Sequence, residues 1–421
     1  MTMISNMPRY EQMKDSGVEW LGEIPEHWKI KRFKFLASVE KGRLPKKIVS
    51  NVDGDYPVYM SMEYLRGGDK TQWVLDKNVK TINEDEILLL WDGSNSGEFI
   101  KSREGVISST VAHIQFLGLN KDFGWFFSFL IERQLRGNTI GMGIPHVDGF
   151  ALTNSIVAIP PLPEQTAIAN FLDQKTAQID QAIALKQKQI ELFKERKQLV
   201  IQQAVTKGLN PAAPMRDSGV EWIGEIPEHW EVKRVKNIFR LIIEPAPINN
   251  NHELLSVYTE IGVKPRKELE EKGNKASTTD GYWMVKKGDF IVNKLLAWMG
   301  AIGLSEYDGV TSPAYDILRP ILDIDGRFFH LFFRTKFCTS ELKKHSRGIM
   351  EMRLRLYFEE FGVIKIPFPC KEEQTAIVAH IETQSAKIDN AINVQQQQID
   401  KLKEYKTTLI NSAVTGKIKV V

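Results

Sequence analysis

The most regular apolar pattern in the chain lies between Pro163 and Gly208. Its apolar residues follow one another after four, seven, four, seven, three and seven residues, and they are Ile168, Leu172, Ile179, Ile183, Ile190, Phe193 and Val200. These steps place the side chains on one stripe of a helix, as the seam of a coiled coil requires. Proline suits the first turn of a helix and glycine its left-handed end. The pattern predicts a helix of roughly 66 Å, at about 1.5 Å per residue, that needs a partner along its seam.

The partner pattern lies near the C-terminus. The sequence EQTAIANFL from Glu164 returns as EQTAIVAHI from Glu373, and AVT at Ala204 returns at Ala413, so both ends share an offset of 209 residues. We expect two helices of equal length that pack against each other; two unrelated surface helices are the alternative. The counterparts of the seam residues are Ile377, Ile381, Ile388, Ile392, Ile399, Leu402 and Leu409.

A second repeat precedes each variable part of the chain. MKDSGVEWLGEIPEHW from Met13 to Trp28 returns as MRDSGVEWIGEIPEHW from Met215 to Trp230, and we call these segments the first and second frames. The chain is therefore an internal duplication of frame, variable region and helix. Two copies in one polypeptide imitate a homodimer, which is usually twofold symmetric. We expect antiparallel helices related by a pseudo-dyad, with one globular domain near each end.

The position of the frames relative to the helices suggests what they contact. The second frame comes shortly after Gly208, and the first would come shortly after Gly416 if the chain ends were neighbours. We therefore expect each frame to pack on a helix end. A peptide that docks on a partner protein is the alternative.

The first variable region, about 29–160, has a mixed α+β pattern. Its turn-rich loops, DGSNSGE from Asp92 and RGNTIGMGIPHVDG from Arg136, are long enough to carry function. Strands are predicted at Tyr56–Met60, Ile87–Trp91, Val106–Ile107, Thr110–Phe116 and Ile156–Ile159, and a helix at Trp125–Arg136. The region opens with a basic cluster of Lys29, Lys31, Arg32, Lys34, Lys41, Arg43, Lys46 and Lys47.

The second variable region, about 231–367, repeats this order of elements with different residues. KKGDFIVNK from Lys286 and GVTSPAYDILRP from Gly309 match the strand patterns, FFHLFFRTKF from Phe328 matches the helix, and FGVIKIPF from Phe361 matches the last strand. Like scaffolds with nearly unrelated loops indicate two like tasks performed on different targets. Its basic residues gather at Lys343, Lys344, Arg347, Arg353 and Arg355.

Composition narrows the class of protein. With 421 residues and 42% hydrophobic content, the chain is globular and long enough for two or three domains. Its cysteines, Cys338 and Cys370, permit neither a disulfide framework nor a zinc cluster and fit a reducing cytosol. The sequence contains no signal-peptide pattern and no apolar run of about 18 residues, so we expect a cytoplasmic protein without a membrane partner. A net charge of +3 is too small to indicate nucleic-acid binding by itself.

The frames, the helix starts PLPEQTAIA and EEQTAIVAHI, and the paired AVT helix ends resemble the specificity (S) subunit of Type I restriction–modification systems. The resemblance extends from about Met13 to Val421. It implies an α+β fold in which two mixed α/β target-recognition domains are separated by two long antiparallel helices. The expected parts are a first target-recognition domain with its frame at 13–160, a central long helix at 161–212, a second domain with its frame at 213–367 and a C-terminal long helix at 368–421.

The same resemblance implies a function. Each domain would read one half of a bipartite, asymmetric target in double-stranded DNA. The helices would set the spacing of the half-sites and bind two modification (methyltransferase) subunits, while restriction subunits would supply motor and nuclease functions. A coiled-coil scaffold whose globular domains bind other proteins is the alternative.

Candidate DNA-contacting residues follow from chemistry and from their place in the loops. Lys and Arg would contact phosphates, whereas polar side chains would read base edges. For any single candidate, an ordinary surface role is an equal alternative. The candidates are Lys41, Arg43, Lys46, Lys47, Ser94, Asn95, Ser96, Arg136, Asn138 and His146 in the first domain, and Lys294, Lys343, Lys344, Arg347, Arg353 and Arg355 in the second.

Catalytic motifs are missing from the sequence. A methyltransferase of the family's partner type would need a glycine-rich cofactor loop and an NPPY-like tetrapeptide, and neither occurs. GMGIPHVDG from Gly141 does not lie between a strand and a helix of a βαβ unit, so we interpret it as a turn-rich loop. DGSNSG has Asn95 at its centre and is no nucleophile elbow, and His146 with Asp148 are too few for a metal site. We expect a non-catalytic subunit that needs no cofactor.

Overall fold

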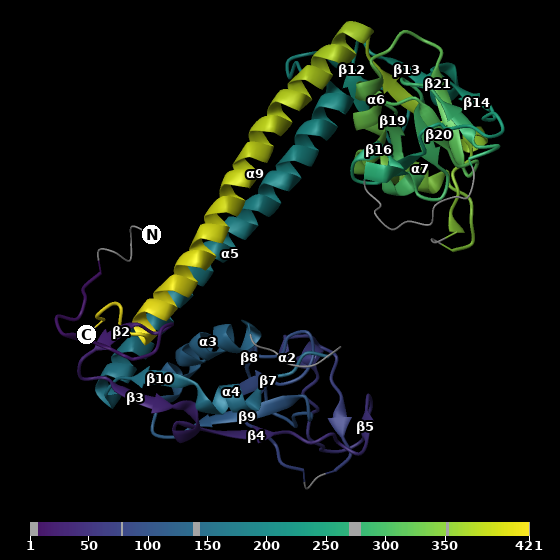
Figure 1. Ribbon diagram of the computed structural model, residues 1–421. Coiled ribbons are helices and arrows are strands. Elements are labelled where there is room, and N and C mark those ends of the chain that lie inside the picture. Colours follow the sequence, from purple (N-terminus) through teal and green to yellow (C-terminus); the bar gives the residue numbers. More distant parts are fainter. Residues whose placement is uncertain (1–6, 77–78, 138–143, 269–278, 351–352, 421) are drawn as a thin grey trace. The chain divides into compact units, whose positions relative to one another are not determined.

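The computed structural model describes residues 7–76, 79–137, 144–268, 279–350 and 353–420. By packing, the chain forms two compact units (Figure 1). Unit 1 contains Met1–Lys186 and Gln397–Val421, and unit 2 contains Gln187–Gln396. Each unit therefore combines one globular region with half of each long helix, whereas the sequence suggested four consecutive parts.

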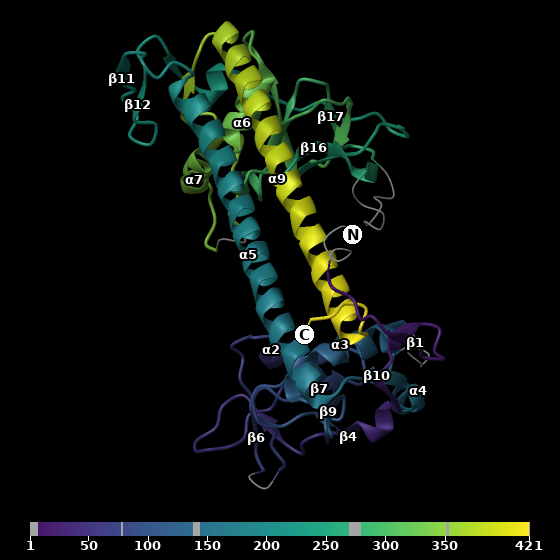
Figure 2. The same ribbon diagram turned by 90° about the vertical axis from the view of Figure 1, so that its left-hand side faces the viewer.

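The two long helices are α5 (Leu162–Lys207) and α9 (Lys371–Val414), which run side by side in Figure 2. They end as the sequence predicted, because Gly208 and Gly416 adopt left-handed φ angles of 72° and 70°. None of the seam residues is exposed. Ile168, Leu172, Ile179, Ile377, Ile381, Ile388, Ile399 and Leu409 are buried, and Ile183, Ile190, Phe193, Val200, Ile392 and Leu402 are half-buried.

Ion pairs across the seam establish the antiparallel direction. In unit 1 Lys406 Nζ lies 2.6 Å from Asp180 Oδ2, and in unit 2 Lys197 Nζ lies 2.7 Å from Asp389 Oδ2. Asp389 and Lys406 are the counterparts of Asp180 and Lys197 at the 209-residue offset, so the same contact is made twice. Such exposed pairs contribute little stability, about 0.2–1 kcal/mol each, and their main effect is on register.

Unit 1 is built on a four-stranded antiparallel sheet in the order β4-β9-β7-β8. Successive residues of a strand point to opposite faces. Ile87 and Leu89 therefore face the core that also holds helix α3 and the helix seam, while Leu88 and Leu90 face a smaller second core. The elements are β4 (Ala37–Lys41), β7 (Ile87–Leu90), β8 (Phe99–Lys101), β9 (Val111–Phe116) and α3 (Lys121–Gly137).

Around this sheet, the predictions for Ile87–Trp91, Thr110–Phe116, Ile156–Ile159 and the helix are confirmed, but two strand predictions are wrong. Val58, Tyr59 and Val106 form only isolated bridges. The two segments approach closely at Gly105, where φ is 151° and an added Cβ would lie 2.4 Å from the Val58 oxygen. The remaining elements are β1 (Met13–Asp15), β2 (Glu23–Pro25), β3 (Lys29–Arg32), η1 (Phe33–Phe35), β5 (Ile48–Val49), α2 (Met62–Leu65), β6 (Trp73–Val74), α4 (Gly149–Asn154) and β10 (Ile156–Ile159).

Unit 2 repeats the sheet as β14-β21-β18-β19. Phe290 and Val292 face the main core and Ile291 the smaller one, as in unit 1. One predicted helix is broken in two, because Thr335 leaves helical geometry and its hydroxyl caps the next helix by accepting from Cys338 N. The central elements are β14 (Phe239–Ile242), β18 (Phe290–Asn293), β19 (Ile302–Leu304), β21 (Tyr315–Pro320), α6 (Gly326–Phe333) and α7 (Lys336–Lys344).

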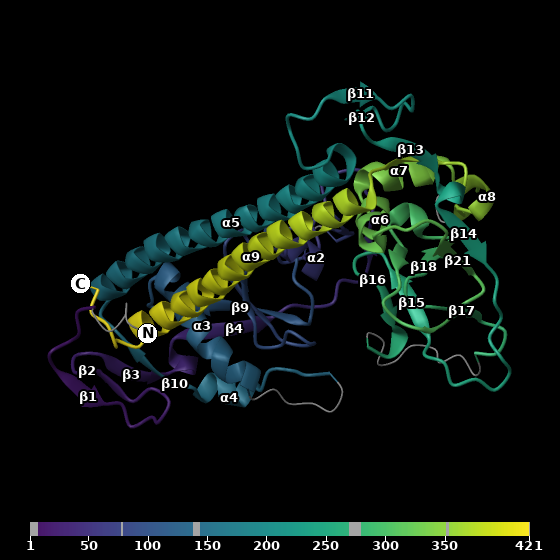
Figure 3. The same cartoon turned by 90° about the horizontal axis from the view of Figure 1, so that it is seen from above.

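Shorter elements complete unit 2, and strands β13 and β22 pair directly before α9 begins, as β3 and β10 do before α5. The hairpin of β11 and β12 lies beside the C-terminal end of α5 (Figure 3). These elements are β11 (Met215–Asp217), β12 (Glu225–Pro227), β13 (Glu231–Arg234), η2 (Val235–Asn237), β15 (Leu255–Tyr258), β16 (Gly262–Pro265), η3 (Arg266–Glu268), β17 (Trp283–Val285), η4 (Ala297–Met299), β20 (Gly309–Thr311), α8 (Phe358–Phe361) and β22 (Lys365–Phe368).

Each frame packs on helix ends, which confirms the prediction. In unit 2 the Glu373 carboxylate, in the first turn of α9, accepts from Trp230 Nε1 at 2.9 Å and contacts His229 Nε2 at 2.9 Å. A carboxylate is also favoured there by the helix dipole. An added Cβ on Gly208 would lie 3.4 Å from the ring of Trp230, so the end of α5 meets the same indole.

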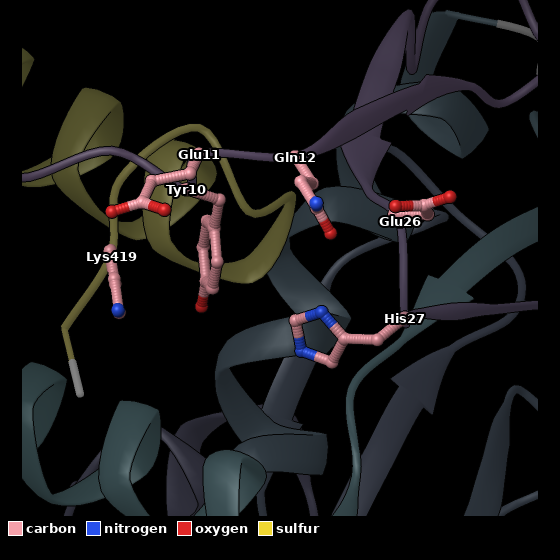
Figure 4. A pocket seen from close by; sticks show the side chains of 6 residues that line it. All are labelled: Tyr10, Glu11, Gln12, Glu26, His27 and Lys419. Carbon is pink, nitrogen blue, oxygen red and sulfur yellow. The ribbon is translucent and has the colours of Figure 1, made fainter.

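The first frame makes the same contacts in unit 1. Glu164 accepts from Trp28 Nε1 at 3.1 Å and contacts His27 Nε2 at 2.8 Å. The hydroxyl of Tyr10 also donates to Glu164, and burial together with this carboxylate raises the Tyr10 pKa. Tyr10 and His27 face each other across a shallow pocket (Figure 4). The repeated glutamate therefore joins each frame to the start of a long helix.

The glutamine that follows each of these glutamates fixes the globular domain to the same helix. Gln165 Nε2 donates to Pro160 O at 2.9 Å, and its Oε1 accepts from Asn120 N at 2.9 Å. Gln374 makes the equivalent bonds, to Pro369 O at 2.8 Å and from Asp325 N at 2.9 Å. Both side chains are buried, so these bonds have no exposed alternative.

Replacing Gln374 by leucine should destabilise unit 2 by about 3 kcal/mol. The variant keeps the side-chain volume but leaves the amide of Asp325 and the carbonyl of Pro369 buried without partners, at about 1–3 kcal/mol each. Urea unfolding followed by tryptophan fluorescence measures the change. Gln189→Leu, the same substitution at an exposed position of α5 within unit 2, is the matched control and should leave the midpoint unchanged. An equal midpoint for Gln374→Leu and the control would show that the hydrogen bonds of Gln374 do not stabilise unit 2.

Candidate nucleic-acid interface

In unit 1 a lysine connects two of the candidate loops. Lys41, at the end of β4, places its ammonium 4.9 Å from the centre of the Trp91 ring and 3.7 Å from Asp92 Oδ2. Trp91 and Asp92 follow β7 directly and begin the DGSNSGE loop. The basic segment after β4 and the polar loop after β7 are therefore neighbours.

The loop after β7 exposes two of its three candidate side chains. Ser94 and Asn95 are exposed, whereas Ser96 is only 4% exposed. The turn bonds from Ser96 N to Gly93 O and from Glu98 N to Asn95 O turn Ser96 inward. Ser96 was predicted as a candidate base reader, but its side chain is buried beneath the loop in this structure.

The loop before α4 lies against the same turn. His146 forms a bridge with Asp92, and Gly93 N donates to Pro145 O at 2.9 Å. His146 thus lies beside the start of the DGSNSGE loop, although it is 52 residues farther along than Ser94. Asn138 lies outside the described residues.

Arg136 lies at the end of α3 and is engaged within the protein. Its guanidinium pairs with Glu98 at 3.1 Å and with Glu132 at 3.0 Å. Burial raises the pKa of Glu132, and the hydrogen bond from Phe99 N opposes this shift. Arg136 therefore holds the loop against α3, and a phosphate would have to compete with two carboxylates for it.

Two of the remaining candidates of unit 1, Arg43 and Lys46, are exposed and line a groove of about 540 Å³ beside β4. Lys47, also exposed, follows them. Lys80 forms a hydrogen bond with Glu40. Because of this contact the pKa of the Glu40 carboxyl lies below its ordinary value, and the carboxylate is paired with Lys80. Gly42 is required where the segment crosses the sheet edge, because an added Cβ would lie 2.3 Å from Ser108 O.

In unit 2, Lys294 occupies the place that Trp91 has in unit 1. Its ammonium donates to Asp316 Oδ1 at 3.1 Å and to Pro313 O at 3.5 Å. Burial raises the pKa of Asp316, and Lys294 opposes that shift. Lys294 is therefore held by an internal partner rather than directed at a ligand.

The other cations of unit 2 lie on and around a hairpin. Arg347 N donates to Arg355 O and Arg355 N to Arg347 O, both at 2.9 Å. Arg347 pairs with Glu360, while the exposed Arg353 and Arg355 have no side-chain ion pair or hydrogen bond with any described residue. The hairpin thus presents two guanidinium groups to solvent.

Two lysines at the end of α7 stand next to this hairpin. Lys343 Nζ lies 4.9 Å from the centre of the Trp298 ring, and Lys344 Nζ lies 2.9 Å from Glu341 Oε2. Sequence reasoning missed the two tryptophans, Trp91 and Trp298, that support Lys41 and Lys343. It also missed the apolar loop of unit 2, although the letters LLAWMG after β18 were a visible signal.

Within the described ranges, His, Cys, Asp and Glu side chains form no group of three or more that could hold a metal ion. The same ranges contain no helix whose length and apolar character would let it cross a membrane.

Fold and surface define a class of protein: two like α/β units, each with a basic loop surface and half of an antiparallel helix pair. A chain from a structural study of complex assembly and conformational transition in the type I R-M system has this fold, with a TM-score of 0.67, 15% identity, and coverage of 93% of this chain and 98% of that one. The crystal structure of the HsdS subunit from Thermoanaerobacter tengcongensis gives a TM-score of 0.53 at 15% identity, over 94% and 98%.

Sequence comparison supplies the family. Residues 25–192 and 227–404 each match the Type I restriction modification DNA specificity domain. The Type I restriction enzyme MjaVIII specificity subunit of Methanocaldococcus jannaschii is 30% identical over 94% of both chains, and the EcoDI specificity subunit of Escherichia coli is 22% identical over 94% of this chain and 90% of its own. The chain belongs to the family of Type I restriction–modification DNA specificity subunits.

Proposed function

We propose that each unit reads one half of a bipartite, non-palindromic DNA target, as part of a Type I restriction–modification complex. The observation that carries this proposal is the duplication itself: the central four-stranded sheets match strand by strand, while the loops at the same places are nearly unrelated in sequence. Two readers with unlike loops recognise unlike half-sites. Their separation would be set by α5 and α9, much as dimer geometry sets half-site spacing in other DNA-binding proteins.

The exposed cations would provide affinity and register. Arg43, Lys46 and Lys47 in unit 1, and Arg353 and Arg355 in unit 2, are suited to phosphates because no described acidic group forms an ion pair with them. Ser94, Asn95 and His146 of unit 1 carry the donors and acceptors that base edges require. Lys41, Arg136, Lys294, Lys343, Lys344 and Arg347 would act chiefly by supporting these loops.

The chain would act without catalysing a reaction itself. Two methyltransferase subunits would bind the outer faces of α5 and α9, which are rich in Gln and Lys, and restriction subunits would join this assembly. The relatives named as specificity subunits support this division of labour. The protein would need no cofactor of its own.

Salt dependence tests the DNA-reading role. The assembled complex with its methyltransferase subunits should bind a duplex with log affinity falling steeply against log salt, with a slope of about −0.9 for each phosphate contact. The double variant Arg353→Gln, Arg355→Gln should make this slope shallower by up to about 1.8. The slope is measured by fluorescence anisotropy of a labelled duplex at about 50–200 mM salt. Over this range, affinity that depends on phosphate contacts falls by orders of magnitude.

The control is Lys287→Gln, an exposed cation of unit 2 that lies outside the candidate loops and approaches Glu306 at 3.9 Å. It should leave the slope unchanged. Binding that is insensitive to salt and to sequence would reject the DNA-reading role and favour a protein scaffold.

A further inference from the structure

The two units carry equivalent loops after the central strand of each sheet. In unit 1 the loop follows β7, and Val147 N donates to Trp91 O at 2.9 Å. In unit 2 it follows β18, and Leu356 N donates to Lys294 O at 2.9 Å. The same contact from the same later segment shows that the loops beginning at Asp92 and Leu295 occupy equivalent places.

These equivalent loops have opposite chemistry. In unit 1 the exposed side chains are Ser94 and Asn95, whose hydroxyl and amide groups are able to donate and accept hydrogen bonds. In unit 2 they are apolar: Leu295 is 38% exposed, Leu296 40% and Met299 52%. Isolated exposed apolar residues are ordinary on protein surfaces. Here, however, they replace polar groups at the position where the other unit presents its candidate base readers.

The neighbouring hairpin of unit 2 adds to this apolar surface. Ile349 is fully exposed and Met350 about half exposed, on the segment that follows α7. Ile349 directly follows Gly348, where the two sides of the hairpin meet. An added Cβ on Gly348 would lie 2.6 Å from Arg353 O, so the two sides of the hairpin are in close contact.

Positive charge surrounds these apolar side chains. Arg353 and Arg355 lie on the return side of the hairpin, and Lys343 stands over Trp298 within the apolar loop itself. A ligand that fits must combine closely spaced negative charge with small apolar groups. Duplex DNA does so, because phosphates border the major groove and the 5-methyl group of thymine projects into it.

We propose that unit 2 reads its half-site chiefly through thymine 5-methyl groups, which contact Leu295, Leu296, Met299 and Ile349, whereas unit 1 reads its half through hydrogen bonds. This inference rests on the proposed function and specifies the recognition chemistry of one of its two readers. It requires A·T pairs in the half-site of unit 2. It also assigns the arginines of the hairpin to the adjacent phosphates.

Replacement of thymine by deoxyuridine removes only the methyl group and therefore tests the inference directly. The target is first mapped from the positions that the complex methylates, and the half-site of unit 2 is the half that persists when residues 29–160 are exchanged. Each methyl group removed from that half should weaken binding by about three- to fourfold, the value for loss of one buried methyl-sized group. The same replacement in the other half should have no comparable effect.

Variants of the loop provide the second measurement. Leu296→Asn and Met299→Gln should weaken binding of the thymine duplex but leave binding of the deoxyuridine duplex nearly unchanged, because the contact is already absent there. Ile248→Asn, at an exposed isoleucine of unit 2 outside both loops, should change neither. Specific binding of the thymine duplex tests the proposed function by itself, so a failure of that function can be distinguished from a failure of this inference.

Three results would overturn the inference. One is a half-site of unit 2 that contains no A·T pair. Another is equal affinity for the thymine and deoxyuridine duplexes. The third is loss of assembly with the methyltransferase subunits in Leu296→Asn and Met299→Gln at unchanged DNA affinity, which would show that a protein covers this surface.

Discussion

Lengthening both long helices by seven residues should increase the spacing between the two halves of the DNA target by about three base pairs. Seven residues add about 10.5 Å of helix, and one base pair spans about 3.4 Å. Seven residues also complete one heptad, so the apolar seam stays in phase. The insertions would duplicate Asp180–Lys186 in α5 and Asn390–Gln396 in α9, next to the boundaries between the units.

The original target should then be bound at least about a hundredfold more weakly, because only one half-site can be engaged at a time. Mapping of methylated positions reads out the new spacing, and each half-site sequence should be unchanged. The same insertion in α5 alone is the control: Asp180 and Lys197 could no longer both meet Lys406 and Asp389, so the helix pair should assemble poorly. Unchanged spacing after the double insertion would show that the helices do not set it.

Exchange of residues 29–160 for those of another family member should change one half of the target and leave the other as it was. The ends of this segment lie side by side, since Lys29 pairs with Ile159 where β3 meets β10. A graft therefore replaces the loops without moving the frame or α5. The donor should preserve the contact between Gln165 and Asn120, which fixes the domain to the helix.

The reciprocal exchange of 231–368, whose ends pair as Glu231 with Phe368, should change only the other half. Sequencing of the methylated sites in cells that express each hybrid complex measures both outcomes. A change of both half-sites after either exchange would contradict independent reading. So would a target that remains the same in both hybrids.

Much of this architecture could be predicted from the sequence because its determinants are local or repeated. The seam of α5 follows from spacing, and the end of the helix follows from Gly208. The duplication then identifies α9 as the partner. The position of the frames was predicted from their place in the sequence shortly after each long helix, on the premise that the two chain ends are neighbours. The contacts of Trp28 and Trp230 agree with this prediction.

The surface could be predicted less well, because exposure depends on turns and distant partners. Ser94 and Ser96 look alike in sequence, yet one turn of the loop exposes the first and buries the second. Lys294 is predicted from the sequence as a DNA contact, but the fold places Asp316, 22 residues away, beside its ammonium group. The role of Gln165 could not be predicted from the sequence, since its partner Asn120 is brought to it only by the folded domain.

The ion pair that occurs twice between α5 and α9 has a consequence for recombination of the gene. Asp180 and Lys197 lie in the first copy of the helix, and their partners Lys406 and Asp389 lie in the second. Each copy therefore encodes both the acid and the base. Gene conversion that overwrites one repeat with the other leaves every pair complementary. The repeats can thus serve as crossover points at which recombination replaces a DNA-reading domain while the register of the helices is inherited intact.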